Sequence, residues 1–499
     1  MFDRAVAQLT EAILERDQPR TTDLFFRMVR REGRSLADAL AVVTKAEAPF
    51  VNVPCHINVK DGAISLVNND HTILGLRTSV ALRPFVRPAE ELLPLLQSVW
   101  YIPAGLDIWN QLLGRYPGRY ATMKGMNVPP PSYGPVVWQH EQEPIVEEGT
   151  LEQRLHAHTI ATVTGDARRA HGLFLGLAAE PESRAALRDH LLFLGLIDLQ
   201  DTIIGRKARN TGHKALRARA VADLADFVGW DQAHGVYYMG VPDMAVGPLY
   251  YSLYDAACVL LTAEFPEDAG KTLVANQGTM TPPEVEDFIA LVVAGTQDEM
   301  WARLTALLRA GISVRNIGDA LQIGAAELIL RTTVPRQFTD AQHAFDYCNV
   351  ANYWLRSTTS PYRARALYLM SNFINDAARS NKLYAPAPAV EVTETSLAAL
   401  DEAILAFDIP RATALAAAWL RNGGDRAAYQ AAVALTACKF QDDPHNQKIT
   451  HSAFEEYGHN STHLRDRLLV APVRLLAGWP KMPGERECFA RWEKDWAKN

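Results

Sequence analysis

The sequence has 499 residues, of which 48% are hydrophobic and 21% are charged, and its formal net charge is −7. This balance is ordinary for a globular protein. The Lys and Arg residues are scattered, so the clustered basic face needed for nucleic-acid binding is not expected. No run of about 18 apolar residues occurs, so no membrane span is expected either. The five cysteines lie far apart and are odd in number, which favours reduced thiols in a cytoplasmic protein.

Helical periodicity extends over nearly the whole chain. Apolar residues recur at spacings of three and four in the segments 4–14, 89–102, 301–312 and 464–478. Helix-start chemistry recurs as well, because Ser35 precedes Asp38, and Thr150 precedes Gln153, at the spacing of a capping pair. We therefore predict an all-α fold.

Three segments depart from the helical pattern. Short alternating runs on either side of Asp61-Gly62 predict one small β-hairpin near residues 57–68. The Pro-rich stretches 127–135 and 383–394 predict extended connectors. The histidine pattern described below occurs on both sides of each connector, so we expect residues 1–499 to form a single large helical assembly.

The stretch richest in basic residues is Gly205–Ala220. It is short and lacks interleaved aromatic residues. We interpret it as a solvated helix and turn, not as a binding surface for nucleic acid.

One short pattern recurs along the chain: an Asp stands three residues before a His. It occurs at Asp231–His234, Asp340–His343 and Asp442–His445, and with Asn in place of Asp at Asn68–His71. A related His-Thr-Ile segment begins at His158 without the acid. The intervals between these histidines are uneven, which indicates degenerate helical repeats joined by loops of variable length.

The pattern has two interpretations. An Asp at this spacing can cap a helix, because its carboxylate accepts a first-turn N–H and suits the positive end of the helix dipole. The histidines would then be structural. Alternatively, helices packed around a central cavity direct their first-turn imidazoles into it, where neutral imidazoles could bind iron, copper or zinc. The candidate metal ligands are His71, His158, His234, His343 and His445.

Neighbouring histidines fit this set less well. His156 and His158 are two residues apart and diverge on a helix, so only His158 is included. His459 and His463 have a spacing that suits zinc, but the Asn-Ser-Thr run at 460–462 favours a loop at His459 followed by a helix cap. The chain contains no His-Glu-x-x-His, P-loop or Gly-x-Gly-x-x-Gly motif, so a Rossmann-type nicotinamide site is not expected.

Three segments resemble a known family: "ALQIGAAELILRT", "DAQHAFDYCNVANYWLR" and "DDPHNQKITHSAFEEY…THLRDRLLVAPVRLLAG". They are similar to the all-helical questin oxidase-like family over residues 304–478, with His343 and His445 as the matching histidines. Fainter similarity occurs at His71, His158 and His234. The resemblance implies oxygen-dependent, Baeyer–Villiger-type monooxygenation of aromatic polyketides with a reduced nicotinamide as electron source. The chain lacks the Cys-x-His…Cys-x-x-His pattern of relatives with a fused Rieske domain, so any electron donor would be external.

We therefore predict an oxidoreductase, an oxygenase acting on a ring-containing small molecule. Its multi-histidine site would bind a transition metal, with iron the first candidate, or serve acid–base catalysis through His234, His343 and His445. Two alternatives stay open. One is a non-catalytic α-solenoid interaction protein whose histidines only cap helices. The other is a metal-free helical hydrolase or lyase with a His base.

Overall fold

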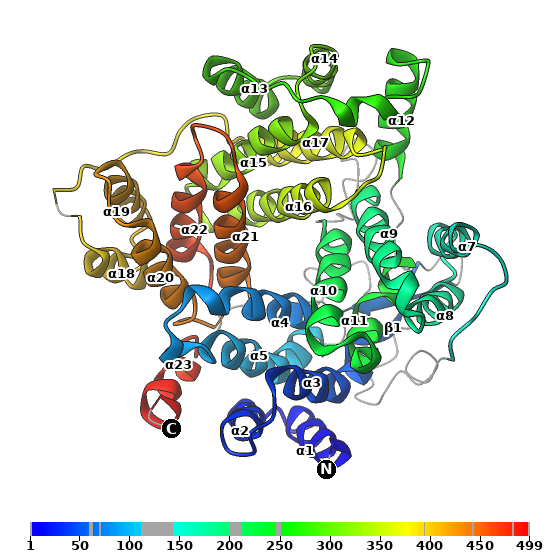
Figure 1. Cartoon of the computed structure of the whole chain (residues 1–499). Helices are drawn as coiled ribbons and strands as arrows, with labels where there is room; N and C mark the ends of the chain where they lie inside the picture. Colours follow the sequence, from blue (N-terminus) through cyan, green and yellow to red (C-terminus); the bar gives the residue numbers. More distant parts are fainter. Residues whose placement is uncertain are drawn as a thin grey trace.

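A computed structural model of the chain describes residues 2–58, 63–68, 71–110, 143–199, 212–245, 251–393, 395–441, 444–481 and 484–497. Apart from one pair of strands, the regular structure in these ranges is helical, which confirms the predicted all-α class (Figure 1). Buried apolar side chains from Leu9 to Trp496 form one extended core, to which nearly every helix contributes. No helix in the described ranges is long and apolar enough to cross a membrane.

The elements follow one another along the chain in three stretches. The first contains α1 (Phe2–Leu14), α2 (Gln18–Arg30), α3 (Leu36–Val51), β1 (Asn52–Asn58), β2 (Ala63–Asn68), α4 (His71–Leu82) and α5 (Leu93–Asn110). The second contains α7 (Leu151–Val163), α8 (Ala167–Ala178), α9 (Arg184–Ile197), α10 (His213–Val228), α11 (His234–Gly240), α12 (Ser252–Glu264), α13 (Pro282–Ala294) and α14 (Gln297–Arg309). The third contains α15 (Val314–Arg331), α16 (Phe338–Ser357), α17 (Ala364–Asn381), α18 (Leu397–Leu405), α19 (Ile409–Arg421), α20 (Arg426–Ala437), α21 (His445–His459), α22 (Asp466–Gly478) and α23 (Glu487–Arg491).

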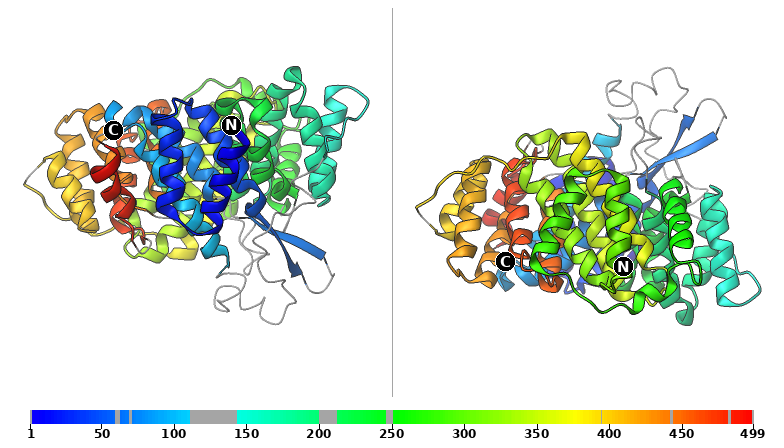
Figure 2. Two further views of the ribbon diagram at one scale, coloured as in Figure 1. Left: turned by 90° about the horizontal axis from the view of Figure 1, so that it is seen from below. Right: turned by 90° about the horizontal axis from the view of Figure 1, so that it is seen from above.

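The β-hairpin predicted near residues 57–68 is present and begins earlier than expected. β1 and β2 are antiparallel, with Asn52 paired to Asn68 and Cys55 to Ser65. The Asp-Gly turn lies outside the described residues. The hairpin projects from the side of the helical body (Figure 2). Of the two predicted connectors, 127–135 lies outside the described residues, and 383–393 is irregular chain between α17 and α18.

Two of the predicted helix starts are confirmed. The Asp38 backbone N–H donates to Ser35 Oγ at 3.0 Å. Thr150 and Gln153 form a reciprocal capping box, in which the Thr150 N–H donates to Gln153 Oε1 at 2.8 Å and the Gln153 N–H to Thr150 Oγ1 at 3.3 Å. These contacts are local, so a sequence pattern is sufficient to predict them.

The proposed Asp caps before the histidines are wrong where the structure describes them. The 3-10 turn Pro335–Gln337 leads directly into α16, so Asp340 lies inside the first turn and accepts a hydrogen bond from Asn381 Nδ2 at 2.7 Å. Asp231 lies in the 3-10 turn before α11 and forms an ion pair with Arg184 of α9. Asp442 lies outside the described residues.

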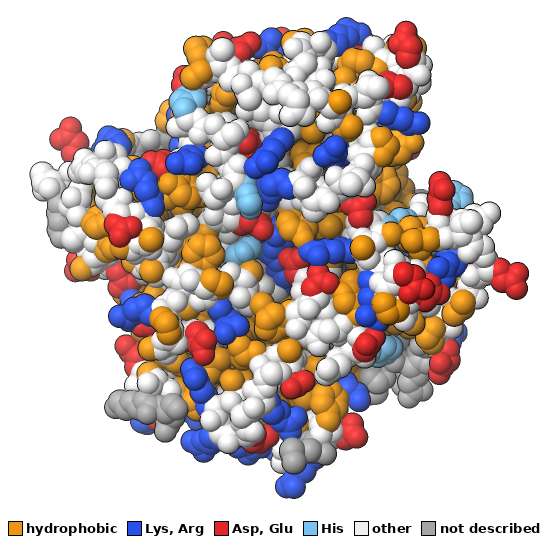
Figure 3. Space-filling view, in the orientation of Figure 1, with side chains coloured by type: hydrophobic (Ala, Val, Ile, Leu, Met, Phe, Trp, Pro, Cys, Tyr) orange, Lys and Arg blue, Asp and Glu red, His pale blue; other side chains and the backbone are white. Residues whose placement is uncertain are grey.

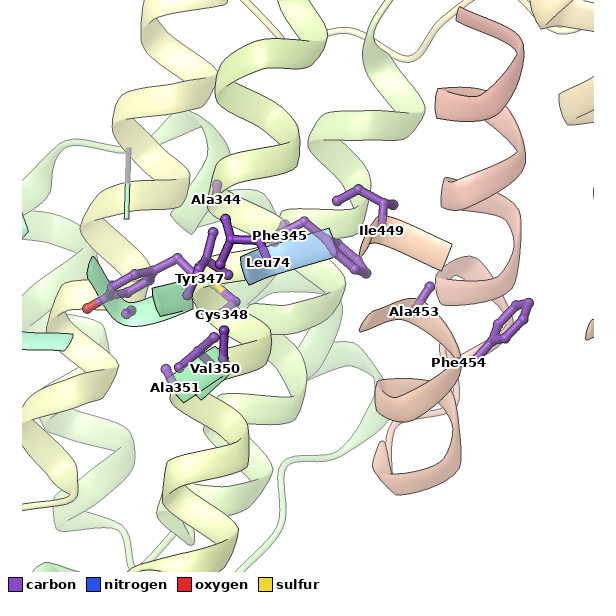
Figure 4. Packing of buried hydrophobic residues seen from close by; sticks show 14 of the residues in the cluster. Leu74, Ala344, Phe345, Tyr347, Cys348, Val350, Ala351, Ile449, Ala453 and Phe454 are labelled. Carbon is purple, nitrogen blue, oxygen red and sulfur yellow. The ribbon is translucent and has the colours of Figure 1, made fainter. Parts of the chain in front are cut away.

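Four helices form a closed frame at the centre of the molecule. α4 packs against α10 and α21, and α16 packs against the same two helices from the other side. Apolar side chains hold the frame together, among them Phe345 and Cys348 of α16 and Ile449 and Ala453 of α21 (Figure 4). The polar side chains of these same helices face one another and form the site described next.

Candidate functional site

Each helix of the frame contributes one histidine, and the four imidazoles meet. His71, His213 and His445 are the first residues of α4, α10 and α21, and His343 lies in the second turn of α16. Ring centroids are 5.4 Å apart between His71 and His213, 4.8 Å between His213 and His343, 5.8 Å between His343 and His445, and 5.2 Å between His445 and His71. The order of the rings follows the order of the helices, so we call this set the four-histidine ring.

The ring is buried on one side and more open on the other. His343 and His445 are 5% and 2% exposed, whereas His71 and His213 are half-buried. Nε2 of His213 and Nε2 of His343 are 2.9 Å apart, so one of these imidazoles donates a hydrogen bond to the other. Trp479, directly after α22, packs against His445 in a tilted arrangement, with ring centroids 4.6 Å apart.

Burial keeps His343 of the ring uncharged. Removal from water, together with the neighbouring His213 and Lys448, holds the pKa of His343 well below its usual value. Three of the four helices begin at the ring, and the positive ends of their dipoles also disfavour protonated imidazole. Neutral imidazoles have a free lone pair, which is the form that binds metals or accepts protons.

A buried ion pair lies one turn beyond the ring. Lys448 Nζ of α21 stands 3.2 Å from Asp346 Oδ2 of α16, and Ser452 Oγ donates to Asp346 Oδ1 at 3.0 Å. Both charged side chains are almost completely buried. They neutralise each other beside His343, and they join the two helices that carry His343 and His445.

Deeper along the same four helices lies a network of charged side chains. Arg219 of α10 binds Glu455 of α21 and also donates to Asn349 of α16, at 2.8 Å. Arg77 of α4 donates to Asp223 of α10 at 2.9 Å and contacts His451 of α21, whose pKa burial lowers to about 3. Charged and His side chains gather at the centre of the face seen in Figure 3, in the area bounded by the frame helices. The network ties all four helices together below the ring.

Two of the predicted site residues lie elsewhere, so the predicted convergence of five histidines is wrong for His158 and His234. His158 on α7 contacts His190 of α9, with 3.1 Å between Nδ1 and Nε2. His234 is exposed at the start of α11. The two residues stand on helices outside the frame, because α7 packs against α8 and α9, and α11 packs mainly against α3 and α10. The repeated spacing therefore predicts where helices begin but not which neighbours their first turns meet.

His213 was missed because it lies in the basic segment interpreted as a solvated helix. That interpretation is wrong for the described part of the segment: α10 is buried along most of its length. Its cations are neutralised by distant acids, Lys214 by Asp198 and Arg219 by Glu455. The available signal for His213 was its position at the start of a helix. Gly212, with a φ of 76°, directly precedes His213 at the start of α10, and Pro444 directly precedes His445 at the start of α21.

The remaining histidines of the C-terminal segment belong to the helix end. His459 is the last residue of α21, where a loop was predicted, and it is exposed. His463 is also exposed, and its Nε2 lies 2.9 Å from Glu286 Oε1. They do not share a site with His445, which is at the other end of α21, fourteen residues from His459.

Buried polar atoms without a hydrogen-bond partner among the described residues accumulate at the ring. They include Nε2 of His71 and Nδ1 of His343. Such atoms are rare in folded proteins and usually mark a bound water, ion or ligand. The donor set thus fits a transition metal, for which imidazole is a common ligand. With the side chains as they stand, however, no three His, Cys, Asp or Glu residues in the described ranges are placed to hold a metal ion.

Comparisons with protein-family models, with curated proteins and with solved structures find no match for this chain.

Proposed function

We propose that the protein is an oxidoreductase, an oxygenase that acts on a ring-containing organic molecule, and that His71, His213, His343 and His445 bind a transition-metal ion, iron first. The observation that carries the proposal is the closed ring of four imidazoles on four helices, three of which begin at that point. If these histidines only capped their helices, we would not expect their imidazoles to cluster. The resemblance to the questin oxidase-like family supports the same class of reaction.

The residues around the ring support metal binding in specific ways. Neutral His343 keeps a lone pair available at physiological pH. The His213–His343 hydrogen bond would have to be exchanged for metal bonds, so these two rings would have to turn, and the donor imidazole would keep its proton on the ring nitrogen that does not bind the metal. Trp479 limits the rotation of His445 from one side. When bound, the metal would supply the redox chemistry by which oxygen is used.

The half-buried pair His71 and His213 forms the side of the ring that is nearer to solvent. A substrate would approach from there, because His343 and His445 are covered by the frame. The buried pair Lys448 and Asp346 holds α16 and α21 at a fixed register behind those covered histidines. This division leaves two half-buried imidazoles on the side nearer to solvent and two held in place.

A metal-free function is the second candidate, favoured by the 2.9 Å contact between His213 and His343. Two imidazoles that share a proton form an acid–base pair, as a His-dependent hydrolase or lyase would need. In that case His343, whose pKa is lowered, would be the base.

Metal analysis separates the two candidates. The protein is reconstituted anaerobically with Fe²⁺, and separately with Zn²⁺ and Cu²⁺, and bound metal is measured after desalting. We expect stoichiometric metal in the wild type, loss of metal in His343→Ala and His445→Ala with unchanged far-UV circular dichroism, and no loss in His156→Ala, an exposed control. Quenching of Trp479 fluorescence, absent in Trp479→Phe, reports binding at this site.

A wild-type protein that binds none of the three metals would refute the metal-binding proposal and leave the acid–base pair. The oxygenase assignment is tested separately by oxygen uptake of the iron-loaded protein with an aromatic polyketide and a reduced nicotinamide. Uptake that is equal in the wild type and in His343→Ala would contradict it.

A further inference from the structure

The hairpin of β1 and β2 is a two-stranded sheet that projects from the helical body (Figure 2). Its strands, Asn52–Asn58 and Ala63–Asn68, are antiparallel, and no other described strand pairs with either of them. Each strand therefore has an outer edge that bears N–H and C=O groups. A two-stranded hairpin is only marginally stable in water, and an open strand edge pairs readily with another strand. The two outer edges are thus the places where a further strand can be added.

Apolar residues occupy both alternating sets of positions in the hairpin. One set contains Val53 and Val67, which are paired with each other, and the other contains Pro54 and Leu66, which are also paired. Successive residues of a strand belong to opposite faces, so each face of the hairpin carries apolar residues. This pattern is typical of strands that are covered on both sides, not of a hairpin that stands alone in water. It indicates that the hairpin is part of a larger sheet.

Pro54 makes the two outer edges different. Opposite residues of an antiparallel pair alternate between hydrogen-bonded and non-hydrogen-bonded pairs. Pro54 has no N–H, so the Pro54–Leu66 pair is of the second kind, and the backbone groups of both residues point away from the neighbouring strand. The outer edge of β1 therefore lacks a donor at Pro54, which is a common protection of an edge strand. The outer edge of β2 keeps both the N–H and the C=O of Leu66.

The outer edge of β2 is complementary to a second copy of itself. Outward backbone groups recur at every second residue, so along β2 they belong to Ile64, Leu66 and Asn68. An identical strand that runs in the opposite direction can pair with this edge about a twofold axis at Leu66. Leu66 then pairs with Leu66 of the second copy, and Ile64 of each copy pairs with Asn68 of the other. This register uses every outward group of the strand, whereas an axis at Ser65 would leave Asn68 to pair beyond the end of β2.

We propose that the protein forms a dimer in which the β2 edges of two copies pair antiparallel about a twofold axis at Leu66, giving a sheet with the strand order β1-β2-β2-β1. Both outer edges of this sheet are β1, which Pro54 protects, so the assembly closes at two copies. β2 ends at Asn68, shortly before His71 of the four-histidine ring, so the second copy would hold the chain that leads into α4. The proposal does not depend on metal binding or on the reaction.

Sedimentation velocity over a range of protein concentrations tests this, and we expect the wild type to be a dimer. Leu66→Pro removes the outward N–H of each copy and should raise the dimer dissociation constant by at least about 100-fold, with the far-UV circular dichroism unchanged. Leu66→Val keeps the N–H and is the matched control, which should remain a dimer. Pro54→Ala alters only the outer edge of β1 and should leave the dissociation constant unchanged.

Disulfide cross-linking provides a second test that does not require a proline. Under mild oxidation Leu66→Cys should give a covalent dimer above the wild-type background, because Cα atoms of a directly opposite pair lie about 5.5 Å apart, within disulfide range. Ile64→Cys should not, since its two copies would lie about 13 Å apart. A monomeric wild type, a dissociation constant unaltered by Leu66→Pro, or equal cross-linking of the two Cys variants would overturn the proposal.

Discussion

Arg219 of α10 is 3% exposed and holds the charge network below the four-histidine ring. Its guanidinium binds Glu455, donates to Asn349 at 2.8 Å, and lies 4.0 Å from the centre of the Tyr353 ring. Arg219→Met keeps the length of the side chain but leaves the Glu455 carboxylate without its main counter-charge. Removal of one partner from a buried pair costs about 3–5 kcal/mol. We expect the free energy of unfolding to fall by about that amount.

Equilibrium urea unfolding, followed by both circular dichroism and Trp fluorescence, measures this loss. Arg30→Met is the matched control, because the ion pair between Arg30 and Glu91 is about one-third exposed on both sides and should cost no more than about 1 kcal/mol. The double variant Arg219→Met with Glu455→Gln should recover about 1–2 kcal/mol, since the amide leaves no unpaired charge. A loss below about 1 kcal/mol in Arg219→Met would refute the view that this network clamps the four helices.

Three further predictions concern stability. Burial raises the pKa of Glu47 to about 8, so the native carboxyl stays protonated, and the protein loses stability as the pH rises from about 4.5 toward 8. Glu47→Gln should therefore raise the free energy of unfolding at pH 7 by as much as about 3 kcal/mol and leave it unchanged at pH 4. Urea titrations at both pH values measure this difference. A Cβ on Gly235 would lie 2.7 Å from the Thr44 carbonyl oxygen, so Gly235→Ala should cost about 1–3 kcal/mol, and a neutral result would show that α3 and α11 can separate freely. Ser35→Ala removes the cap of α3 and should cost about 1 kcal/mol in the same assay, whereas Ser35→Asp should be nearly neutral.

Short-range patterns were sufficient for several features of this protein. The all-α class, the hairpin of β1 and β2 and the caps at Ser35 and Thr150 depend on contacts within a few residues. The same holds for the observation that helices begin at His71 and His445. Each of these follows from backbone hydrogen bonding and side-chain periodicity, which neighbouring residues decide.

The meeting of the four imidazoles depends on how distant helices pack. His213 carries no preceding Asp and stands in a basic stretch, and it joins the ring because distant acids such as Asp198 and Glu455 neutralise the buried cations of α10. His158 begins with the same His-Thr-Ile as His71, yet it faces α9 because α7 packs on the outside of the frame. The local sequence determines which residue begins a helix. The packing of that helix against distant helices determines which neighbours the side chain of this residue contacts.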